Sequence, residues 1–282
     1  MKLAKKRESL ESLVERTSRA IVMIKTPTSS GSGTIVDPRG LILTNRHVVG
    51  TEQVVSVLLY NNIELRGKVL LSNRKYDYAF LVVNYEALLK GKPVFLEPAF
   101  SFNVKAGESV IALGYPLGLA SVVSQGIVGN PSLELGGVFY IQLTAPLNPG
   151  SSGGPLVTDD GKFIGINTSK LRAENYGFAL PVGCVEQEYR SLLKLELNVL
   201  INKLFYCPVC GAMLTEKSRF CPYDGYMIPE IKERWKSYKK LESGPTQPPG
   251  GEIECPVCHN RFSPEGKKYC PYCGVALFKE EK

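Results

Sequence analysis

Short apolar runs with an alternating pattern recur between residues 20 and 200, and they predict β-strands. Two clear examples are residues 54–59 (Val-Val-Ser-Val-Leu-Leu) and residues 110–113 (Val-Ile-Ala-Leu). Glycine, asparagine and proline separate these runs, as they do in proteins built from many short strands. No repeat of solenoid length is present. The pattern therefore predicts an all-β domain.

Residues 1–19 follow a different pattern, because Leu10, Leu13, Val14 and Thr17 recur at helical spacing. They predict a short amphipathic helix ahead of the β-domain. The apolar face of this helix has two possible uses, packing on that domain or an oligomer contact. The sequence leaves both open.

The C-terminal part has a cysteine pattern typical of metal binding. Cys255 and Cys258 form one Cys-x-x-Cys knuckle, and Cys270 and Cys273 form a second one after residues 259–269. Two knuckles at this separation supply four thiolates for one tetrahedral zinc ion. A segment this short has almost no apolar core, so the metal would supply most of its folding free energy. A pair of disulfides is the alternative.

An earlier copy of the same pattern carries one substitution. Cys207, Cys210 and Cys221 match the first three cysteines, and Asp224 stands where the fourth would be. A carboxylate oxygen is an accepted zinc ligand, so a site of three cysteines and one aspartate is possible. Weak or absent metal binding in this copy is the other possibility. The eighth cysteine, Cys184, is isolated in an apolar stretch and is expected in the core.

The segment between the two copies combines two features. Basic and aromatic residues interleave at 232–240, which fits either the solvated face of a helix or a nucleic-acid surface. Residues 244–251 are rich in glycine and proline and predict a linker. The second copy should therefore move relative to the first.

Three separated segments carry residues suited to catalysis. Ser152 lies in a glycine-rich turn, where an exposed hydroxyl can lie beside converging backbone N–H groups. His47 follows the apolar run that begins at Leu41, and its side chain suits a base near neutral pH. Asp77 stands at the entrance of a very apolar run, where a carboxylate needs a partner such as an imidazole N–H. The order His, Asp, Ser along the chain is that of chymotrypsin-like double β-barrels.

The same segments resemble the catalytic motifs of the HtrA/Deg-type trypsin-like serine proteases. The matching segments are residues 44–49 (Thr-Asn-Arg-His-Val-Val), 77–79 (Asp-Tyr-Ala) and 150–155 (Gly-Ser-Ser-Gly-Gly-Pro). Residues 114–118, 122–128, 165–168 and 177–181 resemble other strands and turns of that family. The resemblance runs in order from about Ala20 to about Val185. It implies a double six-stranded β-barrel.

The resemblance also implies a role for each residue. Ser152 would be the nucleophile, His47 the general base that later protonates the leaving amine, and Asp77 the group that holds the imidazole. The backbone N–H groups of Gly150 and Ser152 would form the oxyanion hole. The family more often has asparagine at the position of Ser151, where only the backbone matters to the turn.

Substrate preference rests on fewer residues. Leu147 stands at a position that in the family helps to line the first specificity pocket, and no aspartate occurs in residues 144–151. This favours a small or medium aliphatic substrate side chain over a basic one. The loop at residues 169–176 would also shape the pocket. In the family, the same loop switches the site between active and inactive arrangements.

Composition narrows the cellular setting. The chain of 282 residues carries a formal net charge of +7. No apolar run approaches the ~18 residues that a membrane span requires, and the charged residues 1–19 lack a signal-peptide pattern. Thiolate zinc sites favour a reducing compartment, so a cytoplasmic protein without membrane contact is expected.

These observations predict a protease domain of this family without a PDZ domain, followed by a double zinc ribbon. The predicted segments are 1–19 (helix), 20–200 (protease), 201–230 (first ribbon), 231–251 (linker) and 252–278 (second ribbon). The expected function is cleavage of unfolded or partner-presented proteins, with the ribbons recruiting a protein partner or regulating the enzyme. The alternative is a zinc-ribbon adaptor for protein or nucleic acid on a latent protease fold. The natural substrate, the resting state and any homo-oligomer are not specified by the sequence.

Overall fold

The computed structural model describes residues 8–84, 88, 94–101, 103–115, 122–173, 176–215 and 217–228. For residues 170–173, β15 (Ile253–Glu254) and β16 (Arg261–Phe262) it describes the backbone alone. The predicted linker at 231–251 lies outside the described residues, as do the second-ribbon cysteines Cys255, Cys258, Cys270 and Cys273.

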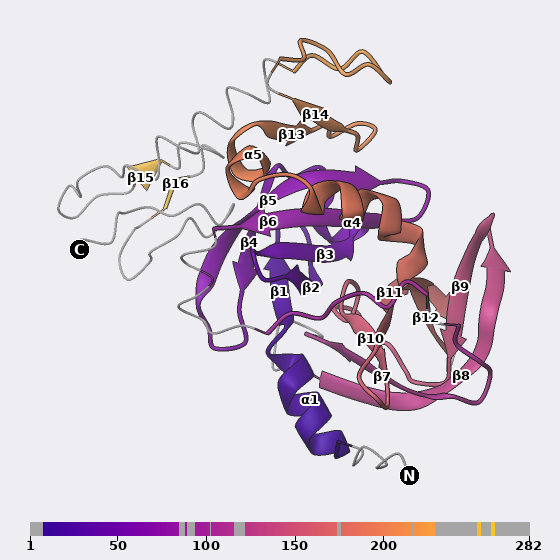
Figure 1. Ribbon diagram of the computed structural model, residues 1–282. Helices are drawn as coiled ribbons and strands as arrows, with labels where there is room; N and C mark the ends of the chain where they lie inside the picture. The colour runs from indigo at the N-terminus through magenta and orange to yellow at the C-terminus, as the bar shows by residue number, and fades with distance from the viewer. Residues whose placement is uncertain are drawn as a thin grey trace.

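Six antiparallel strands close a first barrel (Figure 1). In neighbour order they are β1 (Ile21–Lys25), β2 (Ser30–Asp37), β3 (Leu41–Asn45), β6 (Tyr78–Val83), β5 (Glu64–Asn73) and β4 (Val54–Leu58). Aliphatic side chains such as Val22, Ile42 and Val57 fill its interior. Because β1 pairs with both β2 and β4, this sheet leaves no edge open to another chain.

Six further strands close a second barrel. In neighbour order they are β10 (Pro155–Thr158), β11 (Phe163–Ala173), β12 (Tyr176–Pro181), β9 (Val138–Leu143), β8 (Val122–Leu135) and β7 (Ser109–Gly114). The strand predicted at residues 110–113 lies within β7. The predicted double six-stranded β-barrel is therefore confirmed.

The two barrels share an apolar core. One cluster of buried side chains includes Leu43 and Phe80 from the first barrel and Leu113 and Val157 from the second. Because these side chains contact one another across the boundary, neither barrel is free to shift without opening the cluster. The relative position of the barrels is thus set by packing.

Two helices beyond those predicted from the sequence follow the second barrel: α4 (Glu186–Leu193) and α5 (Leu197–Asn202). They come after a short 3-10 turn, η2 (Val182–Val185). The hydroxyl of Tyr189 in α4 donates to the carbonyl oxygen of Val36 at 3.0 Å, so α4 returns the chain to the first barrel. The architecture is therefore mostly β rather than all-β. In the described part of the chain, no helix has the length and apolar character needed to cross a membrane.

Helix α1 (Leu10–Ser18) lies within the segment for which a helix is predicted. Its N-cap is Ser9, whose hydroxyl accepts the backbone N–H of Ser12 at 3.2 Å. Leu13 is 1% exposed and belongs to the shared core, whereas Leu10 is 45% exposed. The helix therefore packs on the barrels through Leu13.

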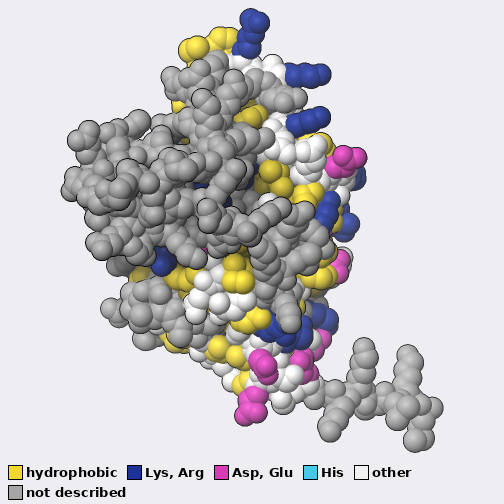
Figure 2. All heavy atoms as spheres, turned by 90° about the vertical axis from the view of Figure 1, so that its left-hand side faces the viewer, with side chains coloured by type: hydrophobic (Ala, Val, Ile, Leu, Met, Phe, Trp, Pro, Cys, Tyr) yellow, Lys and Arg dark blue, Asp and Glu magenta, His cyan; other side chains and the backbone are white. Residues whose placement is uncertain are grey.

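Charged side chains are dispersed over the described part of the face in Figure 2. Lys and Arg groups project along one edge with Asp and Glu groups among them, and further acidic groups lie at the lower end. The basic and aromatic run at 232–240 lies outside the described residues.

The packing of α1 can be tested by two substitutions on the same helix. Leu13→Ala should lower the free energy of unfolding by about 2–5 kcal/mol, because it removes a buried side chain and leaves a cavity. Leu10→Ala should change it by less than about 0.5 kcal/mol, because that side chain is exposed. Urea denaturation measures both. Equal effects would show that α1 does not pack through Leu13.

Candidate active site

The predicted catalytic residues come from both barrels. His47 lies in helix α2 (Arg46–Val49), which begins where β3 ends. Asp77 lies in the turn between β5 and β6, and Ser152 lies in the turn before β10. The carbonyl oxygen of Ser152 accepts the backbone N–H of Ser32 in β2 at 2.7 Å. The serine turn of the second barrel is thereby attached to the first barrel, on which His47 and Asp77 lie.

His47 and Asp77 are paired. Nδ1 of His47 lies 2.6 Å from Oδ2 of Asp77, and the His47 backbone N–H donates to Oδ1 at 3.0 Å. The carbonyl oxygen of Asp77 accepts from the Arg46 N–H at 3.1 Å and from Asn45 Nδ2 at 2.9 Å. The backbone of Asp77 has a φ of 56°, which non-glycine residues seldom adopt. With Nδ1 donating to the carboxylate, Nε2 is the proton acceptor of the imidazole.

Gly153 determines the shape of the serine turn. Its φ is +87°, and an added Cβ would collide with the carbonyl oxygen of Ser32 and the hydroxyl of Thr44. The Gly153 N–H donates to the carbonyl oxygen of Asn167 at 2.9 Å, and the Gly154 N–H donates to that of Ser151 at 3.1 Å. Only glycine allows this close approach of the turn to the first barrel.

The hydroxyl of Ser152 is hydrogen-bonded to Ser169 in β11. The two Oγ atoms lie 2.7 Å apart, and the Ser169 backbone N–H donates to Ser152 Oγ at 2.9 Å. Ser152 itself is only 2% exposed. Among the described residues, Ser152 Oγ has no further hydrogen-bond partner, and His47 is therefore not bonded to it in this arrangement. The serine hydroxyl points to β11 rather than to the histidine.

Ser32 holds the peptide next to the serine. Its hydroxyl donates to the Gly150 carbonyl oxygen at 2.7 Å and accepts the Tyr115 N–H at 2.8 Å. Within the described chain, the backbone N–H groups of Gly150 and Ser152 donate no hydrogen bond. They are therefore available to a ligand oxygen. Sequence reasoning missed Ser32 and the contact of Ser169, although the position of Ser32 between two glycines offered a signal.

Leu147 lies between β9 and β10, five residues before Ser152 in the sequence. The side chain is half-buried and packs against the core of the second barrel. Gly177 in β12 has no space for a Cβ, because Leu147 and the carbonyl oxygen of Ala145 already fill that position. The side chains of loop residues 170–175 lie outside the described residues.

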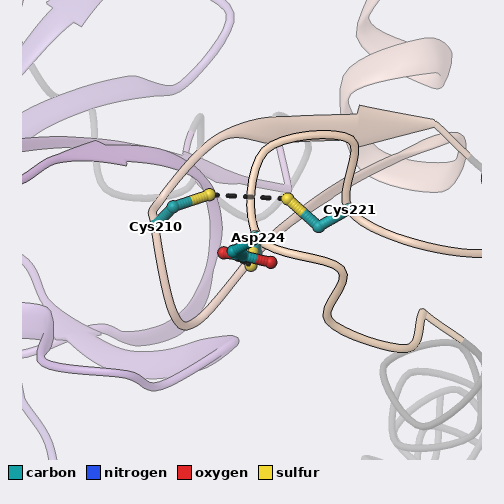
Figure 3. A group of neighbouring side chains, drawn as sticks. Cys210, Cys221 and Asp224 are labelled. Carbon is teal, nitrogen blue, oxygen red and sulfur yellow. Dashed lines mark hydrogen bonds between the residues drawn. The ribbon is translucent and has the colours of Figure 1, made fainter.

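A second group of possible metal ligands lies in the segment for which the sequence predicts a first ribbon. The ligand atoms of Cys207, Cys210, Cys221 and Asp224 all lie within 4.8 Å of one another, and Figure 3 shows three of these side chains pointing toward one another. Cys207 Sγ donates to Asp224 Oδ2 at 3.1 Å, and the Sγ atoms of Cys210 and Cys221 lie 3.5 Å apart. A tetrahedral zinc ion with Zn–S bonds of about 2.3 Å places its ligands roughly 3.5–3.8 Å apart. The group therefore has the ligands and the spacing to hold a metal ion.

Protonation in this group follows from its surroundings. Burial raises the pKa of the Cys210 thiol to about 12. The backbone N–H of Tyr226, which donates to Asp224 Oδ1 at 2.9 Å, holds the pKa of Asp224 well below its usual range, and the neighbouring thiols add to this effect. A metal that binds here must therefore displace thiol protons. Cys184 lies outside this group, half-buried at the margin of the core instead of fully inside it.

Comparison with known proteins agrees with the fold. Residues 31–166 match the sequence model of a family described as trypsin-like peptidase domain. Serine protease HTR4 of Rattus norvegicus is 41% identical over 168 residues, covering 57% of this chain and 33% of that protein. Putative serine protease HhoB of Synechocystis is 40% identical over 171 residues, covering 58% and 40%.

A solved structure shows the same arrangement of barrels. The serine endoprotease from Yersinia pestis superposes with a TM-score of 0.58 at 27% sequence identity, covering 67% of this chain and 68% of that one. The two barrels are therefore similar in sequence to trypsin-like peptidase domains and in fold to that serine endoprotease. The chain spans 33% to 44% of the length of the first four curated relatives that it matches.

Proposed function

We propose that this chain is a serine endopeptidase that hydrolyses peptide bonds of proteins through Ser152, His47 and Asp77. The observation that carries the proposal is the 2.6 Å contact between Asp77 Oδ2 and His47 Nδ1, in a chain whose serine turn is attached to the same barrel. This contact leaves Nε2 as the base. The names of the similar proteins, which are serine proteases, support the same reaction.

The reaction follows from these positions. Ser152 Oγ attacks the substrate carbonyl carbon while His47 Nε2 takes the hydroxyl proton. The oxygen of the tetrahedral intermediate accepts hydrogen bonds from the Gly150 and Ser152 N–H groups, each worth about 3–4 kcal/mol in such sites. His47 then gives the proton to the leaving amine, and an acyl-enzyme forms. A water molecule, deprotonated by His47, attacks the acyl-enzyme and releases the carboxylic acid and Ser152.

Substrate binding has to redirect the nucleophile. In the resting arrangement, the Ser152 hydroxyl is bonded to Ser169, so it must rotate toward His47 before it attacks. Catalytic hydrogen bonds commonly tighten only in the complex with substrate. Because Leu147 is apolar and no aspartate occurs in residues 144–151, we infer that a small or medium aliphatic side chain precedes the scissile bond. Unfolded or partner-presented proteins are the proposed substrates.

The ribbons are proposed to bind structural zinc. In the first ribbon Cys207, Cys210, Cys221 and Asp224 would hold the ion, and the ion would crosslink the two turns that carry them. The second ribbon would use Cys255, Cys258, Cys270 and Cys273. Thiols kept free for zinc favour a reducing compartment such as the cytoplasm. Recruitment of a protein partner or regulation of the protease are the proposed roles of the ribbons.

One observation favours a second function, an adaptor for protein or nucleic acid on a latent protease fold. In the structure, the Ser152 hydroxyl is hydrogen-bonded to Ser169 and not to His47. A protein that never left this arrangement would bind partners without cleaving them. The experiments below separate the two functions.

The first test is the loss of hydrolysis on removal of either catalytic group. Ser152→Ala and His47→Ala should each lower kcat for casein or a peptide by about 10⁵- to 10⁶-fold, because the triad acts as a unit. Ser151→Ala is the matched control and should keep most of the activity. Covalent labelling of Ser152 by a fluorophosphonate gives an independent readout. Absence of both labelling and protein cleavage in the wild type would favour the adaptor.

The contact with Ser169 gives a second test. Ser169→Ala should raise the rate of fluorophosphonate labelling roughly two- to tenfold, because a competing hydrogen bond has a net strength of about 0.5–1.5 kcal/mol. Ser169→Thr keeps a hydroxyl and should label at the wild-type rate. A slower reaction of the alanine variant would mean that Ser169 assists Ser152 instead of restraining it.

Metal content gives a third test. Cys221→Ser should lower the zinc bound per chain by one equivalent, because one ligand of the first site is lost. Asp224→Cys should keep the equivalent, since a fourth thiolate replaces the carboxylate. Elemental analysis of protein purified under reducing conditions measures both, with Cys184→Ala as the control. Equal zinc in the wild type and Cys221→Ser would show that the first ribbon holds no metal.

A further inference from the structure

We propose that metal binding at Cys207, Cys210, Cys221 and Asp224 positions the turn that carries Asp77, so that metal occupancy of the first ribbon controls the protease. The inference rests on the proposed endopeptidase activity and adds a means of regulation to it. The contacts that carry it form a continuous path from the metal ligands to the catalytic aspartate.

The path begins with a shared core. The first ribbon contains β13 (Leu204–Tyr206) and β14 (Met213–Thr215), and β13 lies beside β5 of the first barrel (Figure 1). The side chain of Tyr206 is fully buried in the apolar cluster of that barrel. Gln53 Nε2 donates to the carbonyl oxygen of Tyr206 at 3.2 Å, and Lys68 Nζ donates to that of Ile201 at 2.6 Å. The ribbon is therefore packed on the barrel.

The first metal knuckle then contacts the end of β5. The Ser72 N–H donates to the carbonyl oxygen of Gly211, the residue after Cys210, at 2.9 Å. Gly211 has a φ of +86°, and an added Cβ would collide with the carbonyl oxygen of Ser72. Arg74 Nη1 donates to the carbonyl oxygen of Val209 at 3.5 Å. Two residues of the knuckle thus contact the strand end just before the catalytic turn.

The turn at residues 73–77 continues from this contact to the active site. Asn73 Oδ1 accepts the Tyr76 N–H at 3.0 Å, which closes the turn, and Asp77 follows directly. Asp77 then bonds His47 through both carboxylate oxygens. The turn is therefore held at one end by the knuckle and at the other by His47. Because the φ of Asp77 is unfavourable for a non-glycine residue, the turn needs these contacts to keep its shape.

Metal occupancy decides whether the knuckle can hold the turn. The apolar cluster of the ribbon consists of Phe205, Leu214 and Ile228 together with the ligands Cys207 and Cys221. So few apolar side chains do not order a segment, and a bound metal supplies the missing folding free energy. When the metal leaves, the knuckle loosens and the contact between Gly211 and Ser72 is lost. The aspartate then no longer fixes the imidazole for catalysis.

Two glycines provide a matched test on the full chain. Gly211 and Gly225 each follow a metal ligand and each have a positive φ, but only Gly211 contacts the barrel, since nothing lies within 4 Å of a Cβ at Gly225. Gly211→Ala should keep the bound zinc yet lower kcat by about ten- to a hundredfold with little change in KM, because the catalytic pair is misplaced. Gly225→Ala carries the same backbone strain and should keep the wild-type kcat.

A second readout does not depend on activity. The proton between His47 Nδ1 and Asp77 should give a far-downfield proton resonance, and His259 is the only other histidine in the chain. This resonance should disappear in Gly211→Ala and persist in Gly225→Ala. In the wild type, it should disappear when a chelator removes the metal and return when Zn²⁺ is added. Should Gly211→Ala fail to fold, this metal titration decides the proposal.

The outcomes separate this inference from the proposed function. Wild-type kcat and an unchanged resonance in folded Gly211→Ala, or in metal-free wild type, would overturn the coupling. Equal losses in both glycine variants would also overturn it, because the contact with Ser72 would then have no special effect. If the wild type neither cleaves nor labels, the proposed function fails, and the dependence of the resonance on metal still decides the inference.

Discussion

The packing between the two barrels is the constraint on which the site depends. His47 and Asp77 lie on the first barrel and Ser152 on the second, so no single barrel contains the catalytic set. A common apolar cluster holds the barrels together, and the Ser32 N–H bonds the carbonyl oxygen of Ser152 across their boundary. Because a misplacement of about 1 Å can cost a hundredfold in rate, this packing is part of the chemistry. The closed barrels supply rigidity, and the turns between strands supply the reacting groups.

Within that rigid frame, the serine hydroxyl has two alternative partners. It is bonded to Ser169 in the structure, and catalysis requires it to face His47. One net hydrogen bond is worth about 0.5–1.5 kcal/mol, so the difference between the two orientations is small compared with the binding energy of a peptide. A substrate can therefore select the productive orientation without moving either barrel. The orientation of the Ser152 hydroxyl can therefore change while the pair of His47 and Asp77 stays in place.

The sequence predicts those parts of the molecule whose conformation is determined by residues close together in the chain. Alternating apolar runs predict the strands, and the glycine-rich turn around Ser152 follows from backbone geometry that only Gly153 allows. The contacts of Ser32 and Ser169 were not predicted, because each joins segments that are distant in the sequence. Helix α4 was missed for a different reason. Its buried residues do recur at helical spacing, but the segment is short and follows a long series of strands.

In the segment predicted as the first ribbon, the cysteine repeat does not reveal which residues pack on the protease barrel. Gly211 and Gly225 occupy equivalent places in the cysteine pattern, but only Gly211 lies against the barrel. The boundary predicted between residues 200 and 201 follows that pattern, whereas the side chain of Tyr206 lies in the core of the barrel. In the proposed coupling, loss of a metal ion from this site would disturb β5, because β13 packs beside that strand. Since the turn after β5 carries Asp77, the proposal makes the four candidate metal ligands and Asp77 parts of one cooperative unit.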